Sequence, residues 1–204
     1  LKKISKILNE LIKENNSILN SLSKNYNDKF KKSLLLKFKK YDKIQIIGIG
    51  GSVLGSKAIY NFLQHKISKK FFFADTIKKD MVRASIGKKK LNLIISKSGN
   101  TLETIVNSNL LIKKSDKNIF ITENQNSYLM KVAQKLKAEV IHHNNYIGGR
   151  YSVLSEVGML PAELMGLKSV KFRQFNNLVK NKYFLNSVIE NASITLNLIK
   201  KKKI

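Results

Sequence analysis

The nonapeptide Ser96-Lys97-Ser98-Gly99-Asn100-Thr101-Leu102-Glu103-Thr104 stands between two apolar segments that differ in periodicity. The segment before it, Leu91-Asn92-Leu93-Ile94-Ile95, is a short apolar run of the kind that forms a buried parallel strand. The segment after it, residues 101–113, carries apolar side chains near helical spacing. We therefore expect the chain to pass from a strand through a hydroxyl-rich loop into a helix.

This loop has the composition of an anion-binding site. The unpaired N–H groups and the positive dipole end of the following helix favour an anion, phosphate above all. Ser96, Ser98 and Thr101 add hydroxyl donors, and Lys97 adds a positive charge. Gly99 permits a backbone conformation that other residues avoid. The loop alone thus predicts a phosphate-binding turn.

A second interpretation of the same loop needs no ligand. Asn100 would cap the helix, and Glu103 would complete a capping box with the backbone. The nonapeptide would then be an ordinary connection between a strand and a helix. Both interpretations stay open at this point.

The composition describes a folded chain without cysteine chemistry. Of its 204 residues, 43% are hydrophobic, which argues against disorder, and the absence of Cys excludes disulfides and thiolate metal sites. No apolar run approaches the roughly 18 residues of a membrane span, and no signal peptide is apparent, so a cytoplasmic location without membrane contact is expected. The chain starts at Leu1 and ends at Ile204 directly after four lysines, so we expect a fragment of a longer reading frame. A processed or trimmed chain is the alternative.

The formal net charge of +26 arises from 39 Lys and Arg residues against 13 Asp and Glu residues. A reader of nucleic-acid grooves would cluster its charge and use arginine, yet the lysines are scattered, and arginine occurs only at Arg83, Arg150 and Arg173. Lys, Asn and Ile are all abundant and share A/T-rich codons, which points to genome composition. We expect no nucleic-acid partner, and attraction of anionic metabolites as a by-product.

Strands and helices are expected to alternate along most of the chain, which predicts an α/β fold: a five-stranded parallel sheet with helices on both faces, flanked by extra helices. Ligands of such sheets lie at the carboxyl ends of the strands. The expected domains are an N-terminal helical segment (1–40), a ligand-binding domain (41–166) and C-terminal helices (167–204). The expected strands are 44–49, 71–74, 91–95, 118–122 and 139–142, and the expected helices are 3–23, 28–39, 53–65, 80–86, 101–113, 127–137, 153–165, 169–180 and 184–203, with Pro161 bending the 153–165 helix or marking a restart.

A glycine turn, Gly48-Ile49-Gly50-Gly51-Ser52, follows the first of these strands. The dinucleotide fingerprint G-x-G-x-x-G would need glycine at Val53, so nicotinamide binding is a weak alternative, with Asp75 as its ribose-binding acid. We favour a tight turn that lets a ligand approach the backbone, with Ser52 as a hydroxyl donor. No cofactor is expected.

Arg150 follows two glycines that would expose it at the sheet edge, where a guanidinium can hold a phosphate or stabilise an oxyanion. A surface arginine in a loop is the alternative. His142 and His143 are adjacent, so on a strand they point to opposite faces, and a shared metal is not expected. A structural role is the preferred interpretation for both histidines.

Three motifs in this order resemble the glucose-6-phosphate isomerase (phosphoglucose isomerase) family, specifically its N-terminal sugar-isomerase (SIS) domain. They are Gly48-Ile-Gly-Gly-Ser52, Ser96-Lys-Ser-Gly-Asn-Thr-Leu-Glu-Thr104 and Gly148-Gly-Arg-Tyr-Ser-Val-Leu-Ser155. The resemblance covers about residues 41–166 and implies a flavodoxin-like three-layer sandwich. In the family the Ser-Lys-x-x-x-Thr loop holds the sugar phosphate and the glycine turn lies beside it. The phosphate-binding residues that the resemblance implies are Ser96, Lys97, Ser98, Thr101, Gly51 and Ser52.

The resemblance also implies two catalytic residues. The arginine after two glycines is thought to steady an enediolate in this family, which implicates Arg150. Glu103 matches a glutamate near the ring-opening histidine. The implied activity is the isomerisation of glucose 6-phosphate and fructose 6-phosphate in glycolysis and gluconeogenesis, by a protein that is usually a homodimer.

Departures from the family pattern leave alternatives. Ser98 and Gly99 stand where the family often has Thr and an aromatic residue, which resembles the isomerases that act on both glucose and mannose phosphates. The family's base glutamate, ring-opening histidine and late lysine belong to a C-terminal half that these residues do not include. We therefore expect the chain to supply the phosphate-binding half of the site and to be inactive alone. A non-catalytic sugar-phosphate-binding module is the rival hypothesis.

Overall fold

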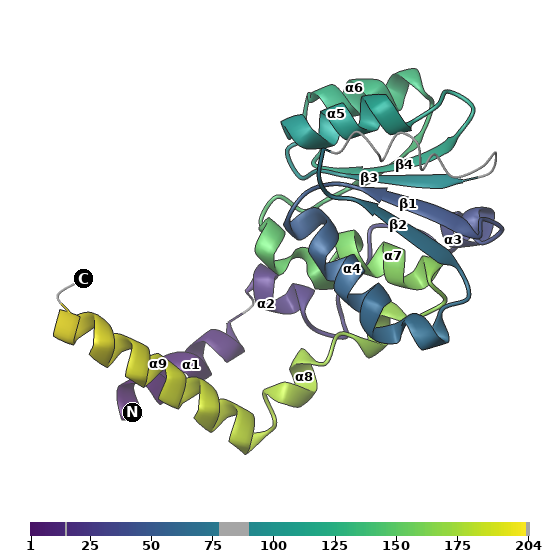
Figure 1. The fold of residues 1–204 in the computed structure, drawn as a ribbon. Helices are drawn as coiled ribbons and strands as arrows, with labels where there is room; N and C mark the ends of the chain where they lie inside the picture. The colour runs from purple at the N-terminus through teal and green to yellow at the C-terminus, as the bar shows by residue number, and fades with distance from the viewer. Residues whose placement is uncertain (15, 78–89, 203–204) are drawn as a thin grey trace. The chain divides into compact units, whose positions relative to one another are not determined.

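A computed structural model describes residues 1–14, 16–77 and 90–202 of the chain (Figure 1). The chain forms two compact units, one of residues 27–169 and one that combines residues 1–26 with 170–204. The domain limits expected after residues 40 and 166 stay predictions beside this division. The expected helix at 80–86 lies outside the described residues.

The unit of residues 27–169 is built on a five-stranded sheet in which every strand pair is parallel. Its order is β2-β1-β3-β4-β5, the flavodoxin-like arrangement. This result confirms the expected α/β class with a parallel sheet. The strands are β1 (Lys43–Ile47), β2 (Lys70–Ala74), β3 (Leu91–Ile95), β4 (Lys117–Thr122) and β5 (Glu139–His142).

Alternate side chains of each strand pack into two separate hydrophobic cores, because successive residues of a strand point to opposite faces of the sheet. Ile46 and Leu93 belong to the core on one face, whereas Ile47 and Ile94 belong to the core on the other, and all four are fully buried. The first core is covered by α3 (Lys32–Phe38), α4 (Gly51–Leu63) and α7 (Glu156–Leu164), and the second by α5 (Leu102–Leu111) and α6 (Tyr128–Lys135) (Figure 1).

Capping residues correct two of the expected helices. The helix expected at 3–23 is two helices, α1 (Lys2–Lys13) and α2 (Ser17–Ser21), because the Asn16 side chain accepts the N–H groups of Ile18 and Leu19 and starts α2. The helix expected at 153–165 is a 3-10 helix, η3 (Gly149–Leu154), followed by α7. The restart is at Ser155, whose hydroxyl accepts the Val157 N–H, and α7 continues through Pro161.

The second unit consists of helices. The stretch expected to be one helix at 169–180 holds two short ones, η4 (Ser169–Lys171) and α8 (Phe175–Leu178), and a long helix, α9 (Lys182–Lys202), follows. Within this unit the guanidinium of Arg173 lies 4.8 Å from the ring centre of Tyr26, and the Asn176 side chain accepts the Lys24 N–H at 3.0 Å.

A 3-10 turn, η1 (Gln64–Lys66), extends α4 in the sheet unit. None of the described helices is long and apolar enough to cross a membrane.

Candidate functional site

The loop after β3 folds around the hydroxyl of Ser96, a residue with only 1% of its surface exposed. The Ser96 Oγ lies 2.9 Å from the Thr101 Oγ1 and accepts the backbone N–H of Gly99 at 3.1 Å. Gly99 has a φ of +65°, and a Cβ there would overlap the Ser127 hydroxyl at the start of α6. The glycine is therefore required both by its backbone conformation and by its neighbour.

The capping box of the ligand-free alternative does not form at the start of α5. Thr101 is the N-cap residue of α5, and its side chain makes no capping hydrogen bond to the backbone of that helix. Asn100 instead accepts the N–H of Tyr128, the first residue of α6, at 2.9 Å. Because Asn100 serves the neighbouring helix, the first turn of α5 is left to present its N–H groups at the end of the sheet.

Glu103 lies half-buried in that first turn of α5. The structure gives its carboxylate no hydrogen bond or ion pair with another described residue. Ser98 is exposed, and its hydroxyl accepts the N–H of Asn100 at 3.2 Å.

The glycine turn after β1 lies directly against the loops that follow β3 and β5. A Cβ on Gly48 would lie 2.7 Å from the backbone oxygen of Ile95, the last residue of β3. A Cβ on Gly51 would overlap the backbone carbonyl of Gly149. Gly50 takes a φ of +55° as the chain turns into α4. Neighbouring backbone therefore leaves no room for a side chain at Gly48 or Gly51, whereas Gly50 is required by its positive φ.

The third loop is fastened to the glycine turn by a serine. The Ser152 Oγ lies 2.7 Å from the carbonyl oxygen of Gly149 and 3.3 Å from that of Gly51. Arg150 is exposed, and its guanidinium makes no hydrogen bond or ion pair with the described part of the chain. Ser52 is half-buried in the first turn of α4.

The three loops meet at the carboxyl ends of the strands, around the position where the strand order reverses. β1 and β3 are neighbours in the sheet, α4 leaves β1 over one face, and α5 leaves β3 over the other. Such a switch point opens a crevice between the two loops, and it is where open parallel sheets bind their ligands. Sequence position and sheet topology thus bring Ser96, Thr101, Gly51 and the Arg150 loop to one end of the sheet.

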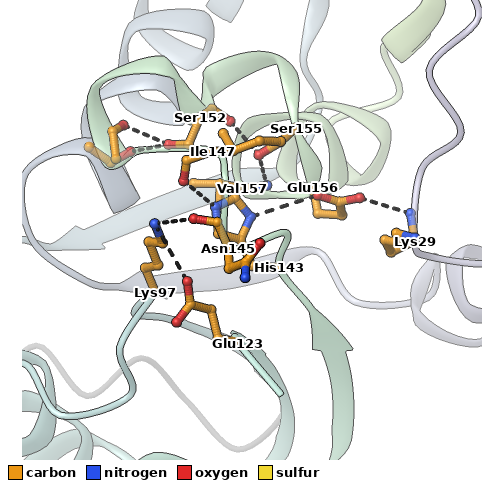
Figure 2. A network of polar contacts seen from close by, with 12 residues as sticks. Lys29, Lys97, Glu123, His143, Asn145, Ile147, Ser152, Ser155, Glu156 and Val157 are labelled. Atoms are coloured by element: carbon orange, nitrogen blue, oxygen red, sulfur yellow. Dashed lines mark hydrogen bonds and ion pairs between the residues drawn. The ribbon is translucent and has the colours of Figure 1, made fainter. Parts of the chain in front are cut away.

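Lys97 was expected to add positive charge to the phosphate-binding loop, but its ammonium bonds to residues after β4 and β5. Its ammonium donates to the backbone oxygen of Asn145 at 2.6 Å and lies 3.5 Å from the Glu123 carboxylate (Figure 2). It therefore links the loop after β3 to the loop after β5. Asn145 and Glu123 carry no signal in the sequence, since only the sheet topology brings residues after β4 and β5 next to residue 97.

The weak nicotinamide alternative finds no support. Val53, where the fingerprint needs its third glycine, is fully buried in the core. Asp75, the candidate ribose-binding acid, forms an ion pair with Lys57 of α4 at 2.6 Å. The Asp75 carboxylate thus already has an ion-pair partner within the chain.

The two adjacent histidines point to opposite sides. His142 is exposed, whereas His143 is buried, with its Nε2 3.1 Å from the Ile147 oxygen and its Nδ1 3.8 Å from the Glu156 carboxylate. No group of three acidic or histidine side chains that could hold a metal occurs within residues 1–14, 16–77 and 90–202. Glu156 was not singled out from the sequence, because nothing in the linear pattern connects it to a histidine 13 positions earlier.

Comparison with known proteins agrees with this geometry. The sequence model described as phosphoglucose isomerase matches residues 10–202. Glucose-6-phosphate isomerase of Methanocaldococcus jannaschii is 32% identical over 170 residues, which cover 73% of this chain and 42% of that protein. The enzyme of the same name from Acholeplasma laidlawii is 33% identical over 180 residues, with 74% and 42% covered. The chain thus spans about two-fifths of the length of these relatives.

Solved structures show the same fold. A hypothetical protein, TT0462, from Thermus thermophilus has a TM-score of 0.63 at 22% identity, with 88% of this chain and 46% of that chain covered. Tagatose-6-phosphate ketose/aldose isomerase from Escherichia coli has a TM-score of 0.54 at 17% identity, with 72% and 45% covered. From the match over residues 10–202, together with the glycine turn and hydroxyl loop at the switch point, the chain belongs to the phosphoglucose isomerase family.

Proposed function

We propose that this chain supplies the phosphate-binding half of an enzyme that interconverts glucose 6-phosphate and fructose 6-phosphate. The observation that carries the proposal is the juxtaposition of the hydroxyl loop, the uncapped start of α5 and the glycine turn at the switch point of the sheet. Backbone N–H groups, hydroxyls and a helix dipole are the donors that a phosphoryl group needs.

The phosphate would bind among the donors at the start of α5. Ser96 and Thr101 would turn their paired hydroxyls from each other to the phosphate, and Ser98 would add a third from the loop tip. On the opposite side of the crevice, Gly51 would allow the ligand close to the backbone, and Ser52 would donate its hydroxyl. Lys97 stays a predicted ligand, and its ammonium would have to leave the Asn145 oxygen to reach the phosphate.

The reaction requires a group that moves a proton between C1 and C2 and a cation that stabilises the enediolate oxygen. Arg150 is suited to the second task, because it follows Gly149, whose backbone packs against the glycine turn, and its exposed guanidinium has no partner among the described residues. Glu103 is a carboxylate at the same end of the sheet, and we propose it as an auxiliary catalytic group. The remaining acid–base groups would come from the part of the family's length that this chain does not span.

The phosphate site is tested by titrating the purified chain with fructose 6-phosphate in a calorimeter. Ser96→Ala combined with Thr101→Ala should weaken binding at least about tenfold, since two hydroxyl hydrogen bonds to a charged group are lost. Ser33→Ala combined with Thr195→Ala removes two exposed hydroxyls elsewhere and serves as the control. Unchanged affinity in the first variant would contradict the loop assignment.

A non-catalytic sugar-phosphate-binding module is the second candidate. The composition of the site favours this candidate. The site offers several hydrogen-bond donors for binding a phosphate, whereas Glu103 is its one carboxylate without a partner among the described residues. Incubation of the purified chain with fructose 6-phosphate tests catalysis directly, and appreciable isomerisation without added protein would contradict the half-site proposal. The proposed setting is a cytoplasmic homodimer of the complete enzyme without nucleic-acid or membrane partners. Light scattering of that enzyme would test the homodimer.

A further inference from the structure

The carbonyl group of Lys97, in the loop after β3, is held by two donors at the carboxyl end of β4. It accepts the backbone N–H of Glu123 at 3.0 Å and the hydroxyl of Thr122 at 3.2 Å. Thr122 is the last residue of β4, and only 1% of its surface is exposed. Its hydroxyl therefore gives the loop a contact for which water competes little.

The next two carbonyl groups of the loop are held by the segment between β4 and α6. The Ser98 oxygen accepts an N–H of the Gln125 side chain at 3.0 Å, and the Gly99 oxygen accepts the backbone N–H of Leu129 at 3.0 Å. A carbonyl oxygen can only accept, so the Gln125 amide must present its nitrogen to Ser98. The carbonyl oxygens of residues 97–99 thus all point toward residues 122–129.

These contacts fix the direction of the N–H groups in the same peptide units. In a planar trans peptide unit the C=O and N–H groups point in opposite directions, so the N–H groups of residues 98–100 point away from residues 122–129. Those of Gly99 and Asn100 are bonded within the loop, to the hydroxyls of Ser96 and Ser98. The N–H of Ser98 has no acceptor among the described residues.

The strand order decides what lies on the other side of the loop. β3 stands between β1 and β4 in the sheet, so a donor that is turned away from the β4 side faces the β1 side (Figure 1). The glycine turn after β1 lies there, with Gly48 packed against the backbone oxygen of Ile95. The Ser98 N–H therefore faces the crevice in which the phosphate is proposed to bind.

We propose that Thr122 and Gln125 are positioning residues, which hold the carbonyl side of the loop after β3 and so keep its N–H side turned to the phosphate. Glu123 and Leu129 contribute backbone N–H groups that almost any residue would supply, so the side chains of Thr122 and Gln125 are the selected parts of this contact. The inference rests on the proposed function and deepens it. Neither side chain touches the ligand in this account.

Two substitutions of Thr122 separate the hydroxyl from packing. Thr122→Val keeps the shape and removes the donor to the Lys97 oxygen, and calorimetry should show about a three- to tenfold loss of fructose 6-phosphate affinity. Thr122→Ser keeps the donor and should bind within about twofold of the unaltered chain. Because Thr122→Ser loses a buried methyl group, the affinity that it retains reports the hydroxyl and not the packing.

The matched control for Thr122 lies at the other end of the same strand. The Asn118 side chain is buried, accepts an N–H of Asn92 at 2.8 Å and donates to the Asp116 oxygen at 3.2 Å. Asn118→Leu removes both bonds and should lower stability, yet its affinity should stay within about twofold of the unaltered chain. An equal loss of affinity in Asn118→Leu and Thr122→Val would overturn the proposal.

Gln125 is tested by Gln125→Met, which keeps the length of the side chain and removes its donor. Its control is Gln134→Met, since Gln134 is also exposed and its side chain makes no hydrogen bond with a described residue. Gln125→Met should lose about two- to fivefold in affinity, and its combination with Thr122→Val at least about tenfold. Equal affinities of Gln125→Met and Gln134→Met would overturn the role of Gln125.

A measurement without ligand tests the loop itself. The Gly99 N–H is bonded to the Ser96 hydroxyl, so its exchange with deuterium reports opening of the loop. Relative to the N–H of Leu93 inside β3, it should exchange about tenfold faster in the combined Thr122→Val and Gln125→Met variant than in the unaltered chain. An unchanged ratio would overturn the proposal.

The outcomes separate this proposal from the proposed function. If the unaltered chain binds no fructose 6-phosphate, the proposed function fails, and the exchange ratio still decides whether Thr122 and Gln125 hold the loop. If the unaltered chain binds and Thr122→Val binds equally well, the positioning role is overturned while the proposed function stands. Should Thr122→Val fail to fold, the exposed substitution Gln125→Met carries both measurements.

Discussion

The carbonyl group of Gly149 lies so close to the Cα of Gly51 that a Cβ on Gly51 would overlap it. This contact presses the glycine turn after β1 against the loop after β5, and it joins residues that are almost 100 positions apart in the sequence. The close approach explains why residue 51 is a glycine.

Gly51→Ala should therefore force the two loops apart. We expect the free energy of unfolding to fall by about 1–3 kcal/mol, the usual cost of overpacking, together with weaker binding of fructose 6-phosphate. Gly149→Ala is the matched comparison, since a Cβ at Gly149 meets nothing within 4 Å, and its stability should change by less than about 0.5 kcal/mol. Urea unfolding of the two variants measures the difference. Equal losses in both would mean that the contact is not tight.

Gly99→Ala tests the loop after β3. Alanine would have to take the left-handed conformation, and its Cβ would overlap the Ser127 hydroxyl that accepts the Met130 N–H at the start of α6. We expect a loss of about 2–3 kcal/mol, about half from the backbone and half from the disturbed cap. Gly166→Ala isolates the backbone part, because Gly166 has a φ of +88° and open space around it. A Gly99 variant no less stable than the Gly166 variant would contradict this account.

Lys97→Met probes the link between the phosphate loop and the loop after β5. The ammonium is partly exposed and shared between Asn145 and Glu123, so its removal should cost less than about 1 kcal/mol of stability. Because Glu123 already compensates much of the charge, calorimetry should show about a threefold loss of fructose 6-phosphate affinity, less than for the Ser96 and Thr101 double variant. A loss greater than that of the double variant would make Lys97 the main phosphate ligand.

Lys90 gives the stability of the chain a dependence on alkaline pH. It is buried before β3, where its ammonium donates to the Gln45 side chain and to the Leu111 oxygen, both at 2.8 Å. Burial lowers the pKa of Lys90 below its ordinary value of 10.5, while Asp116 raises this pKa and Lys113 lowers it. Between the lowered pKa and 10.5 the unfolded chain binds more protons, so this residue contributes more stability as pH rises through that window.

The measurement for Lys90 is a comparison with Lys90→Met. The variant should be less stable by about 1–3 kcal/mol at neutral pH, because Gln45 and Leu111 lose a buried donor. It should also lose this residue's share of the alkaline rise in stability, seen as the difference between two urea series from pH 8 to 11. Parallel pH curves for the two proteins would contradict the assigned direction of the shift.

Local pattern was sufficient for much of the fold. The strands at Leu91–Ile95 and Glu139–His142 occur where the sequence predicts them, because a short apolar run between turn residues has few alternatives to a buried strand. Helix boundaries were less well predicted at Asn16 and Ser155. Each of these side chains caps a new helix inside a continuous apolar pattern, and periodicity alone does not register a cap.

The sequence by itself determined the parallel α/β sheet and the hydroxyl loop between β3 and α5, because strand and helix periodicities and turn residues are local properties. Tertiary structure alone decided which groups surround that loop. Asn100 caps α6 and not α5, the Lys97 ammonium bonds to Asn145, and His143 faces Glu156. Each of these contacts joins separate strand–helix units, so it exists only once the strand order has brought their ends together.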